Sequence, residues 1–273
     1  IILDFVCILN LHMGVMGAGV ATVFSQGLSA LLCLFYIGRK FPILHLKRSN
    51  WKFDWHFAWY HLRLGIPMAV QSSVIATGAM AIQASLNSYG AIAMAGYAAA
   101  SRTEQLVSQV LISLGLTLAT FVGQNYGARS YARIREGVRK CTVITMTIAI
   151  IGAVLIILFG RTLTLFFIGA DAENAEQMVY YSRQYLSITA CCYPILSCIF
   201  IFRNVMQGVG STGIVLIGSV IELLCRLVGA FILAAAFGYM GVCLAGPLAW
   251  LGAALLFVIT YFLKMPKLKR QLS

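Results

Sequence analysis

The chain has 273 residues, of which 60% are hydrophobic and only 10% are charged. Soluble domains carry about 25% charged residues, so this composition excludes a soluble globular protein and indicates one that lies in a lipid bilayer. The net charge of +12 does not indicate nucleic-acid binding, because Lys and Arg lie in short stretches between long apolar runs, without the interleaved aromatic residues of a nucleic-acid groove.

Seven apolar segments are long enough to cross the hydrocarbon core, which takes about 20 helical residues. They are residues 16–38, 65–86, 93–123, 141–159, 180–203, 214–237 and 242–263. A shorter apolar segment, residues 1–11, precedes them, and because the chain opens inside it without Met or a signal peptide, we expect a fragment of a longer protein. The sequence predicts an all-α integral membrane fold with about seven spanning helices.

The basic residues predict the orientation of these helices. Most of the 20 Lys and Arg residues lie after the first segment, after the third segment and at the C-terminal end. The loop between the fourth and fifth segments instead carries Asp171, Glu173 and Glu176, with Arg161 nearby. Since Lys and Arg are enriched in cytoplasmic loops, we expect the three basic stretches and the C-terminus to be cytoplasmic.

The longest polar stretch, residues 39–61, is the best domain boundary. Trp51, Trp55, Trp59 and Leu62 recur at the spacing of one helix face, which predicts an interfacial helix anchored by tryptophans; an irregular linker is the alternative.

A similarity between two segments of the chain supports this boundary. GVMGAGVA, which begins at Gly14, is similar to GYMGVCLA, which begins at Gly238, and each octet opens a spanning segment on the non-cytoplasmic side. We therefore predict four parts of the chain. They are residues 1–38, which end one helical lobe with a partial helix and one spanning helix, the cytoplasmic linker 39–61, a six-helix lobe over residues 62–264, and a basic cytoplasmic tail, residues 265–273.

No motif in the sequence predicts catalysis, a metal site or a cofactor. GVGSTG, residues 208–213, fits G-x-G-x-x-G but follows a membrane helix rather than a strand, so it predicts a tight turn between two spanning helices. The eight cysteines show no C-x-x-C spacing and the four histidines no metal-ligand spacing. We do not expect an enzyme.

Charged residues within the spanning segments are costly and are the best candidates for a functional site. Arg102 and Glu104 lie near the middle of their helix, but two residues apart they point in different directions. Glu104 therefore needs a partner from another helix, a water-filled cavity or a proton, and a functional role is favoured over a structural one.

Glu222, Arg226 and Gln71 complete the set of candidates, whereas Arg203 is interpreted as structural. Glu222 and Arg226 have the favourable i, i+4 order, so a neutralised structural pair and a functional pair are equally acceptable interpretations. Arg203 lies near a helix end, where its long side chain can reach the interface. Gln71 follows Pro67 in a polar, bendable helix entry that suits a cavity wall.

At these residues the chain resembles the MATE (multidrug and toxic compound extrusion) family. The most specific matching piece is GQNYGA, residues 123–128, at the end of a membrane helix. The other pieces, in family order, are Ile2-Leu3-Asp4, GVMGAGVATVFSQ (residues 14–26), Gly65-Ile66-Pro67 with Gln71, QGVG (residues 207–210), and Glu222 with Arg226.

The resemblance implies twelve helices in two six-helix lobes around a central cavity. It implies secondary active export of organic, often cationic, compounds by alternating access in antiport with Na⁺ or H⁺. This chain would supply helices six to twelve, so its expected partners are the lipid bilayer, small organic substrates and a missing N-terminal lobe. The expected location is the bacterial inner (plasma) membrane, with no cofactor other than the coupling ion.

One departure from the family affects the site. Some members carry a coupling carboxylate on helix seven, whereas residues 65–86 contain no Asp or Glu. The coupling site is therefore expected in the missing lobe or at Glu104, with Glu222 as a weaker candidate.

The nearest alternative is a lipid-linked saccharide flippase of the same superfamily, whose cavity needs several basic residues for a pyrophosphate. Only Arg102 and Arg226 lie deep in this chain, which favours efflux. A seven-helix receptor or retinal protein is disfavoured because the last segment has no Lys at its midplane.

Overall fold

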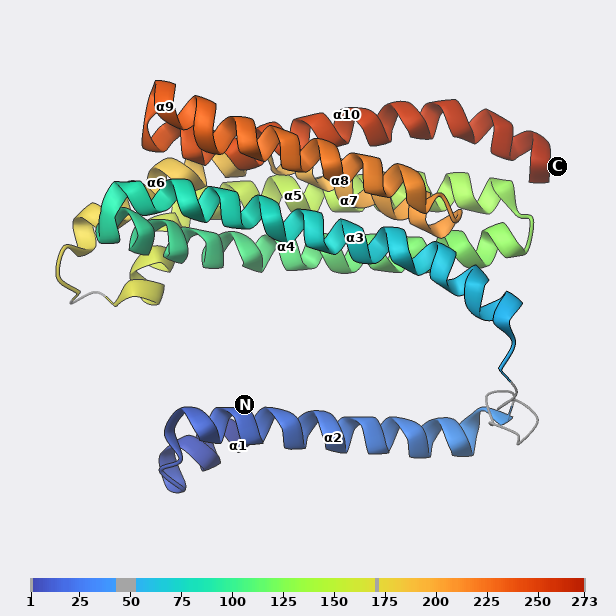
Figure 1. Cartoon of the computed structure of the whole chain (residues 1–273), viewed down its shortest axis with the longest axis horizontal. Helices are drawn as coiled ribbons and strands as arrows, with labels where there is room; N and C mark the ends of the chain where they lie inside the picture. The colour runs from blue at the N-terminus through green and yellow to red at the C-terminus, as the bar shows by residue number, and fades with distance from the viewer. Residues whose placement is uncertain (1, 43–52, 170–171, 273) are drawn as a thin grey trace. The chain divides into compact units, whose positions relative to one another are not determined.

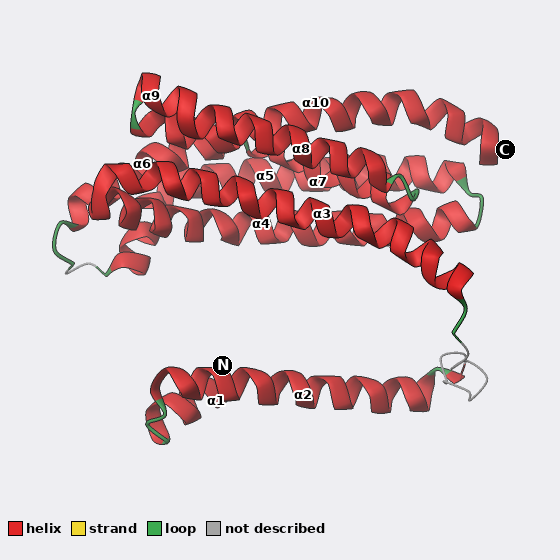
Figure 2. Ribbon diagram, viewed as in Figure 1, coloured by secondary structure: helices red, strands yellow, loops and turns green. Residues whose placement is uncertain are grey.

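The computed structural model describes residues 2–42, 53–169 and 172–272, which are α-helical and contain no strand (Figure 2). The chain divides into two compact units, Ile1–Trp59 and Tyr60–Ser273. Of the residues used above, Trp51 and Asp171 lie outside the described ranges.

The first unit is built around one long apolar helix. A short helix α1 (Ile2–Phe5) and a π-helical segment (Val6–Asn10) lead through a turn into α2 (Gly14–Lys40), which contains the predicted segment 16–38. Gly17 permits the close approach of α2 to the preceding segment, because a Cβ there would lie 3.0 Å from the Cys7 carbonyl oxygen. Arg39 and Lys40 end α2, where cations interact favourably with the helix dipole.

The second unit is a bundle of long helices whose chain direction alternates (Figure 1). Its elements are α3 (Trp55–Leu86), a 3₁₀ turn (Asn87–Tyr89), α4 (Gly90–Gly127), α5 (Tyr131–Ile168), α6 (Ala175–Cys191), α7 (Tyr193–Gly208), α8 (Thr212–Leu227), the π-helical segment η5 (Val228–Leu233), α9 (Ala234–Phe237) and α10 (Tyr239–Leu272).

The count of membrane-crossing helices differs from the prediction. By length and apolar character, five helices of the described residues could cross a membrane, or six when α6 and α7 are taken together as one bent span. The predicted number was seven. The difference arises because α3 and α4 form one helical run of 73 residues, Trp55–Gly127, although the chain reverses direction within it (Figure 1). Gly90, with a φ of 83°, marks this reversal, since glycine adopts positive φ without steric cost.

Proline has different effects in different helices. α6 and α7 meet at an angle of 54°, and Pro194 stands at the first positions of α7, where its ring suits a helix start. Pro67 and Pro247 instead lie inside α3 and α10 without ending them. Of these three prolines, only Pro194 therefore coincides with a break between helices.

The core of the second unit is centred on α4 and α7. Leu111, Leu118 and Val122 of α4 are buried in the main hydrophobic cluster, together with Tyr193 at the start of α7. Gly115 allows this packing, because a Cβ there would lie 2.5 Å from Asn204 Nδ2 and 3.1 Å from the Phe200 carbonyl oxygen. Small residues at such contacts let membrane helices approach closely.

Both glycine-rich motifs form tight turns at the same end of this unit. GQNYGA closes α4, and its Asn125 is buried and donates to the Phe121 carbonyl at 2.8 Å. GVGSTG joins α7 to α8, as predicted, with Gly210 at a φ of 73°. Lys264 Nζ donates to Ser211 Oγ at 2.8 Å, which ties α10 to this turn.

Two segments predicted as separate are continuous with spanning helices. Trp55 and Trp59 belong to α3 itself rather than to a distinct interfacial helix. Residues 265–272 continue α10 instead of forming a tail, because Met265 and Leu268, one helical turn apart, are only 6% and 8% exposed in the core.

Candidate functional site

Glu104 receives its partner from another helix. The side chain is half-buried on α4, and the hydroxyl of Tyr185 on α6 donates a hydrogen bond to Glu104 Oε2. Tyr185 is buried, so its orientation is fixed by its surroundings. A hydrogen bond to a charged acceptor is stronger than a neutral one, and the Tyr185–Glu104 contact therefore links α4 to α6 inside the bundle.

A group of tyrosines, the tyrosine cluster, extends from this contact toward the ends of the helices that carry Gly90 and Tyr239. Tyr97, two turns before Glu104 on α4, stacks edge to face on Tyr185 with ring centroids 4.7 Å apart. Tyr181 and Tyr89 pack in the same manner on Tyr239, at 4.8 and 6.0 Å. Tyr239 Oη donates to the Tyr181 carbonyl at 3.2 Å. The cluster joins α4, α6 and α10 with polar groups inside an apolar bundle.

Arg226 of α8 lies close to Glu104 and to α3. Its positive charge acts on the carboxylates of both Glu104 and Glu222. The side chain crosses α3 at Gly78, where a Cβ would lie 2.8 Å from Arg226 Cδ. Its Nε is buried and, within the described residues, has no hydrogen-bond partner. Arg226 is therefore a cation that attracts two acids, Glu104 and Glu222, without an ion pair within 4.0 Å to either in the described part of the chain.

Glu222 is buried, with 5% of its surface exposed, and interacts electrostatically with Arg203 as well as with Arg226. Among the described residues, no ion pair within 4.0 Å joins Glu222 to Arg226. The closed intrahelical pair considered from the sequence is thus not formed. The π-helical segment η5 begins two residues after Arg226, and such segments are frequent at functional sites.

Arg203 was expected to reach the interface, and the structure corrects this. The guanidinium instead lies over the ring of Phe200, 5.1 Å from its centroid, and its Nε is buried with no hydrogen bond to the described part of the chain. Packing of α7 against its neighbours, together with the attraction of Glu222, holds the side chain inside.

Two candidates from the sequence lie apart from this group. Arg102 is exposed and lines a cavity of about 560 Å³ with residues from the end of α5 and the start of α6, including Phe167 and Met178. Gln71 is buried on α3, on the same face as Gly78. The structure thus brings together Glu104, Glu222 and Arg226, joined by Tyr97, Tyr185 and Arg203, and places Arg102 elsewhere.

The tyrosines were missed in the sequence because aromatic residues are common in apolar segments. The available signal was a phenol group inside a span, since a buried Tyr hydroxyl usually finds a hydrogen-bond partner. In the described residues, no group of three or more His, Cys, Asp or Glu side chains could hold a metal ion. The site contains two carboxylates, several phenols and two guanidinium groups.

The fold is that of a multi-pass α-helical membrane protein with a cluster of buried polar side chains in its second unit. The family model described as MatE matches residues 67–232. The chain therefore belongs to the MatE family, which agrees with the resemblance seen in its motifs; the members of this family are transporters and not enzymes.

Relatives and solved structures agree with this assignment. Probable multidrug resistance protein YpnP of Bacillus subtilis is 28% identical over 201 residues, which cover 73% of this chain and 43% of that protein. Multidrug export protein MepA of Staphylococcus haemolyticus is 23% identical, and the match covers 89% of this chain and 52% of that protein. The chain thus spans about half the length of the curated relatives it matches.

Among solved structures, two are similar over 98% of this chain and 60% of their own. They are an outward-facing multidrug resistance MATE family transporter of the MOP superfamily and a MOP superfamily transporter from Pyrococcus furiosus, each with a TM-score of 0.89 and 18% identity. At this identity the likeness shows the shared fold.

Proposed function

We propose that this chain forms part of a secondary active multidrug efflux transporter of a bacterial plasma membrane. It exports organic, often cationic, compounds in antiport with Na⁺ or H⁺ by alternating access. The relatives named above are multidrug resistance and export proteins, and the part of their length that this chain does not span is the proposed partner lobe. The basic ends of the helices, including the C-terminus, face the cytoplasm.

The observation that carries this proposal is the position of Glu104. A carboxylate deep in a spanning helix is costly unless it is paired, hydrated or protonated. Glu104 has one hydrogen-bond donor, Tyr185, and no ion pair within 4.0 Å in the described part of the chain. It therefore retains the capacity to bind a coupling ion or a substrate cation.

Arg226 gives the site two alternative charge pairings, one with Glu104 and one with Glu222. It attracts both Glu104 and Glu222 without being bound to either. A cation that binds Glu104 repels Arg226 toward Glu222, and its release allows Arg226 to return. Such an exchange couples occupancy to the position of α8, which alternating access requires. The tyrosine cluster would orient Glu104 and offer its phenol rings to organic cations. Gln71 and Arg102 are assigned to the walls of the substrate path.

The proposal is tested by Glu104→Gln in the full-length protein. The amide keeps the volume of the side chain and removes its charge, so we expect normal abundance in the membrane and at least tenfold slower efflux of cationic dyes. Glu136→Gln is the matched control, because Glu136 is an exposed carboxylate paired with Lys140 at 2.6 Å. Efflux by Glu104→Gln at the wild-type rate, normalised to protein in the membrane, would contradict the assignment.

A further inference from the structure

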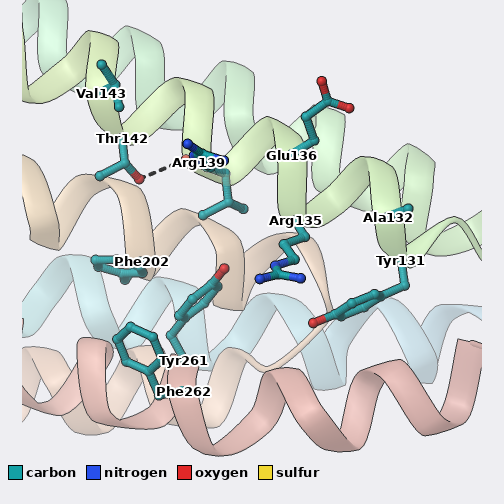
Figure 3. A pocket seen from close by; sticks show the side chains of 11 residues that line it. Tyr131, Ala132, Arg135, Glu136, Arg139, Thr142, Val143, Phe202, Tyr261 and Phe262 are labelled. Atoms are coloured by element: carbon teal, nitrogen blue, oxygen red, sulfur yellow. Dashed lines mark hydrogen bonds between the residues drawn. The ribbon is translucent and has the colours of Figure 1, made fainter.

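A groove in the second unit lies outside the proposed transport site, at the basic ends of the helices. It has a volume of about 730 Å³ and lies between α5, α7 and α10. Tyr131, Arg135 and Arg139 line it from α5, Phe202 from α7, and Tyr261 and Phe262 from α10. We call it the α5–α10 groove (Figure 3).

The apolar part of this groove is a platform of aromatic rings. The Tyr261 ring packs on Phe202 and on Phe262, with centroids 4.9 and 5.4 Å apart. Phe262 is 66% exposed, and all three residues belong to apolar segments that are long enough to cross the bilayer. Phe202 is only 8% exposed, so Phe262 and the half-buried Tyr261 form the accessible apolar surface, and on a spanning helix such a surface meets lipid chains.

The polar part of the groove is cationic. Arg135 extends from α5 into the space beside Tyr131 and Tyr261 (Figure 3), and Arg139 follows one turn later toward the membrane. Within the described residues neither arginine forms an ion pair.

The adjacent acid does not neutralise these arginines. Glu136 also lines the groove, but its carboxylate is paired with Lys140 at 2.6 Å and not with Arg135 or Arg139. The groove therefore has two free guanidinium groups at its polar end and aromatic rings at its apolar end, and it begins at the first turn of α5, where the helix dipole is positive.

We propose that the α5–α10 groove is a binding site for an anionic phospholipid. The phosphate accepts hydrogen bonds from Arg135 and Arg139, and an acyl chain lies along Phe262 and Tyr261. Guanidinium groups match phosphate geometry, and basic pockets between spanning helices bind anionic headgroups. A soluble anion would use the arginines but not the rings, which is why a lipid is the better occupant. The proposal requires only that the helices lie in a membrane, and it is independent of the transport function.

The test measures binding of phosphatidylglycerol to the purified full-length protein in detergent, by native mass spectrometry. Phosphatidylcholine with the same acyl chains and inorganic phosphate serve as comparison probes. We expect phosphatidylglycerol to bind at least tenfold more tightly than phosphatidylcholine. Arg135→Gln with Arg139→Gln should remove this preference, a change in affinity ratio of at least tenfold (about 1.4 kcal/mol), because both charge-assisted contacts to the headgroup are lost. Phe262→Ala should weaken the binding of both phosphatidylglycerol and phosphatidylcholine.

A matched control removes two charges at the same end of the bundle but outside the groove, by Arg133→Gln with Lys269→Gln, two exposed residues that do not line it. This variant should keep the preference for phosphatidylglycerol. An equal loss of the preference for phosphatidylglycerol in both double variants would show a general effect of charge and would contradict binding in the groove. Inorganic phosphate that competes fully with the lipid would show an anion site and overturn the lipid assignment. Unfolding temperatures in lipid-free detergent identify any variant that is simply misfolded.

Discussion

Buried and half-buried polar side chains carry the chemistry of the second unit, and they are stabilised by different kinds of contact. Glu104 has a phenol donor from α6, Arg203 an aromatic face, and Arg226 two acids at a distance. Buried polar groups are stable only when such contacts offset their desolvation. Substitutions that remove one of these contacts should therefore differ in whether they slow transport or lower stability.

Tyr185→Phe should slow transport without lowering abundance. The change removes only the hydroxyl that donates to Glu104, and a hydrogen bond to a charged group is worth about 1.5–3 kcal/mol, so we expect roughly tenfold slower dye efflux per molecule. Tyr181→Phe, one turn earlier on α6, is the control because its ring packs on Tyr239 but its hydroxyl does not contact Glu104. Equal efflux rates for the two variants would show that the Tyr185 hydroxyl does not act in transport.

Glu222→Gln should act on stability. The carboxylate is buried and attracts both Arg203 and Arg226, so its loss leaves Arg203 with no nearby acid and Arg226 with Glu104 alone. Removing one member of a buried charge group costs on the order of 3 kcal/mol. We expect a lower unfolding temperature in detergent and reduced abundance in the membrane. A variant that is abundant but inactive would reverse the roles assigned to Glu222 and Glu104.

At the scale of elements, glycine determines how closely the helices approach one another. Gly208, at the end of α7, lies directly on α4, whereas Gly213, in the first turn of α8, has open space around it. The break between α6 and α7 at Pro194 is a bend within one candidate span, and a bent span can change its angle with little change in packing.

Gly208→Ala should destabilise the contact between α4 and α7. The new Cβ would lie 2.7 Å from the Ala119 carbonyl oxygen and 2.9 Å from Val122 Cβ, and backbone cannot move aside as a flexible side chain can. Overpacking of this kind costs about 1–3 kcal/mol. Gly213→Ala meets nothing within 4 Å and should leave the unfolding temperature unchanged or slightly higher. Equal unfolding temperatures for the two variants would contradict the close packing.

At the scale of the whole molecule, the placement of charge decides how the helices cross the membrane. The turn between α4 and α5 is rich in arginine, while the opposite end of α5 is followed by Glu173 and Glu176, the latter paired with Arg161 at 2.5 Å. This asymmetry predicts that Ala172 faces the outside and Ala132 the cytoplasm.

Single cysteines at these two positions test that orientation. The eight native cysteines are first replaced, and an impermeant thiol reagent is then applied to intact cells. Ala172→Cys should be labelled, and Ala132→Cys should be labelled only after the membrane is permeabilised. The opposite pattern would invert the topology and, with it, the direction assigned to transport.

The sequence by itself determined that the protein lies in a lipid bilayer, and it determined the fold class, the family and the general positions of the helices. Hydrophobic length and charge asymmetry are local properties, and a bilayer converts them directly into spans because unpaired backbone groups are not tolerated in lipid. The turns at GQNYGA and GVGSTG were predictable for the same reason. The continuity of α10 through residues 265–272 was not, because it depends on where Met265 and Leu268 find partners.

Only the tertiary structure decided which polar residues meet. The sequence could separate Arg102 from Glu104 by helix geometry, but it could not select Tyr185, 81 positions away, as the donor to Glu104, nor show that Arg226 attracts two acids on different helices. It equally gave no sign that Arg135 and Arg139 lie beside the aromatic rings of Phe202 and Tyr261. Contacts between helices depend on the rotation and separation of each helix in the bundle, which are set by the packing of many residues together and by no single segment of the chain.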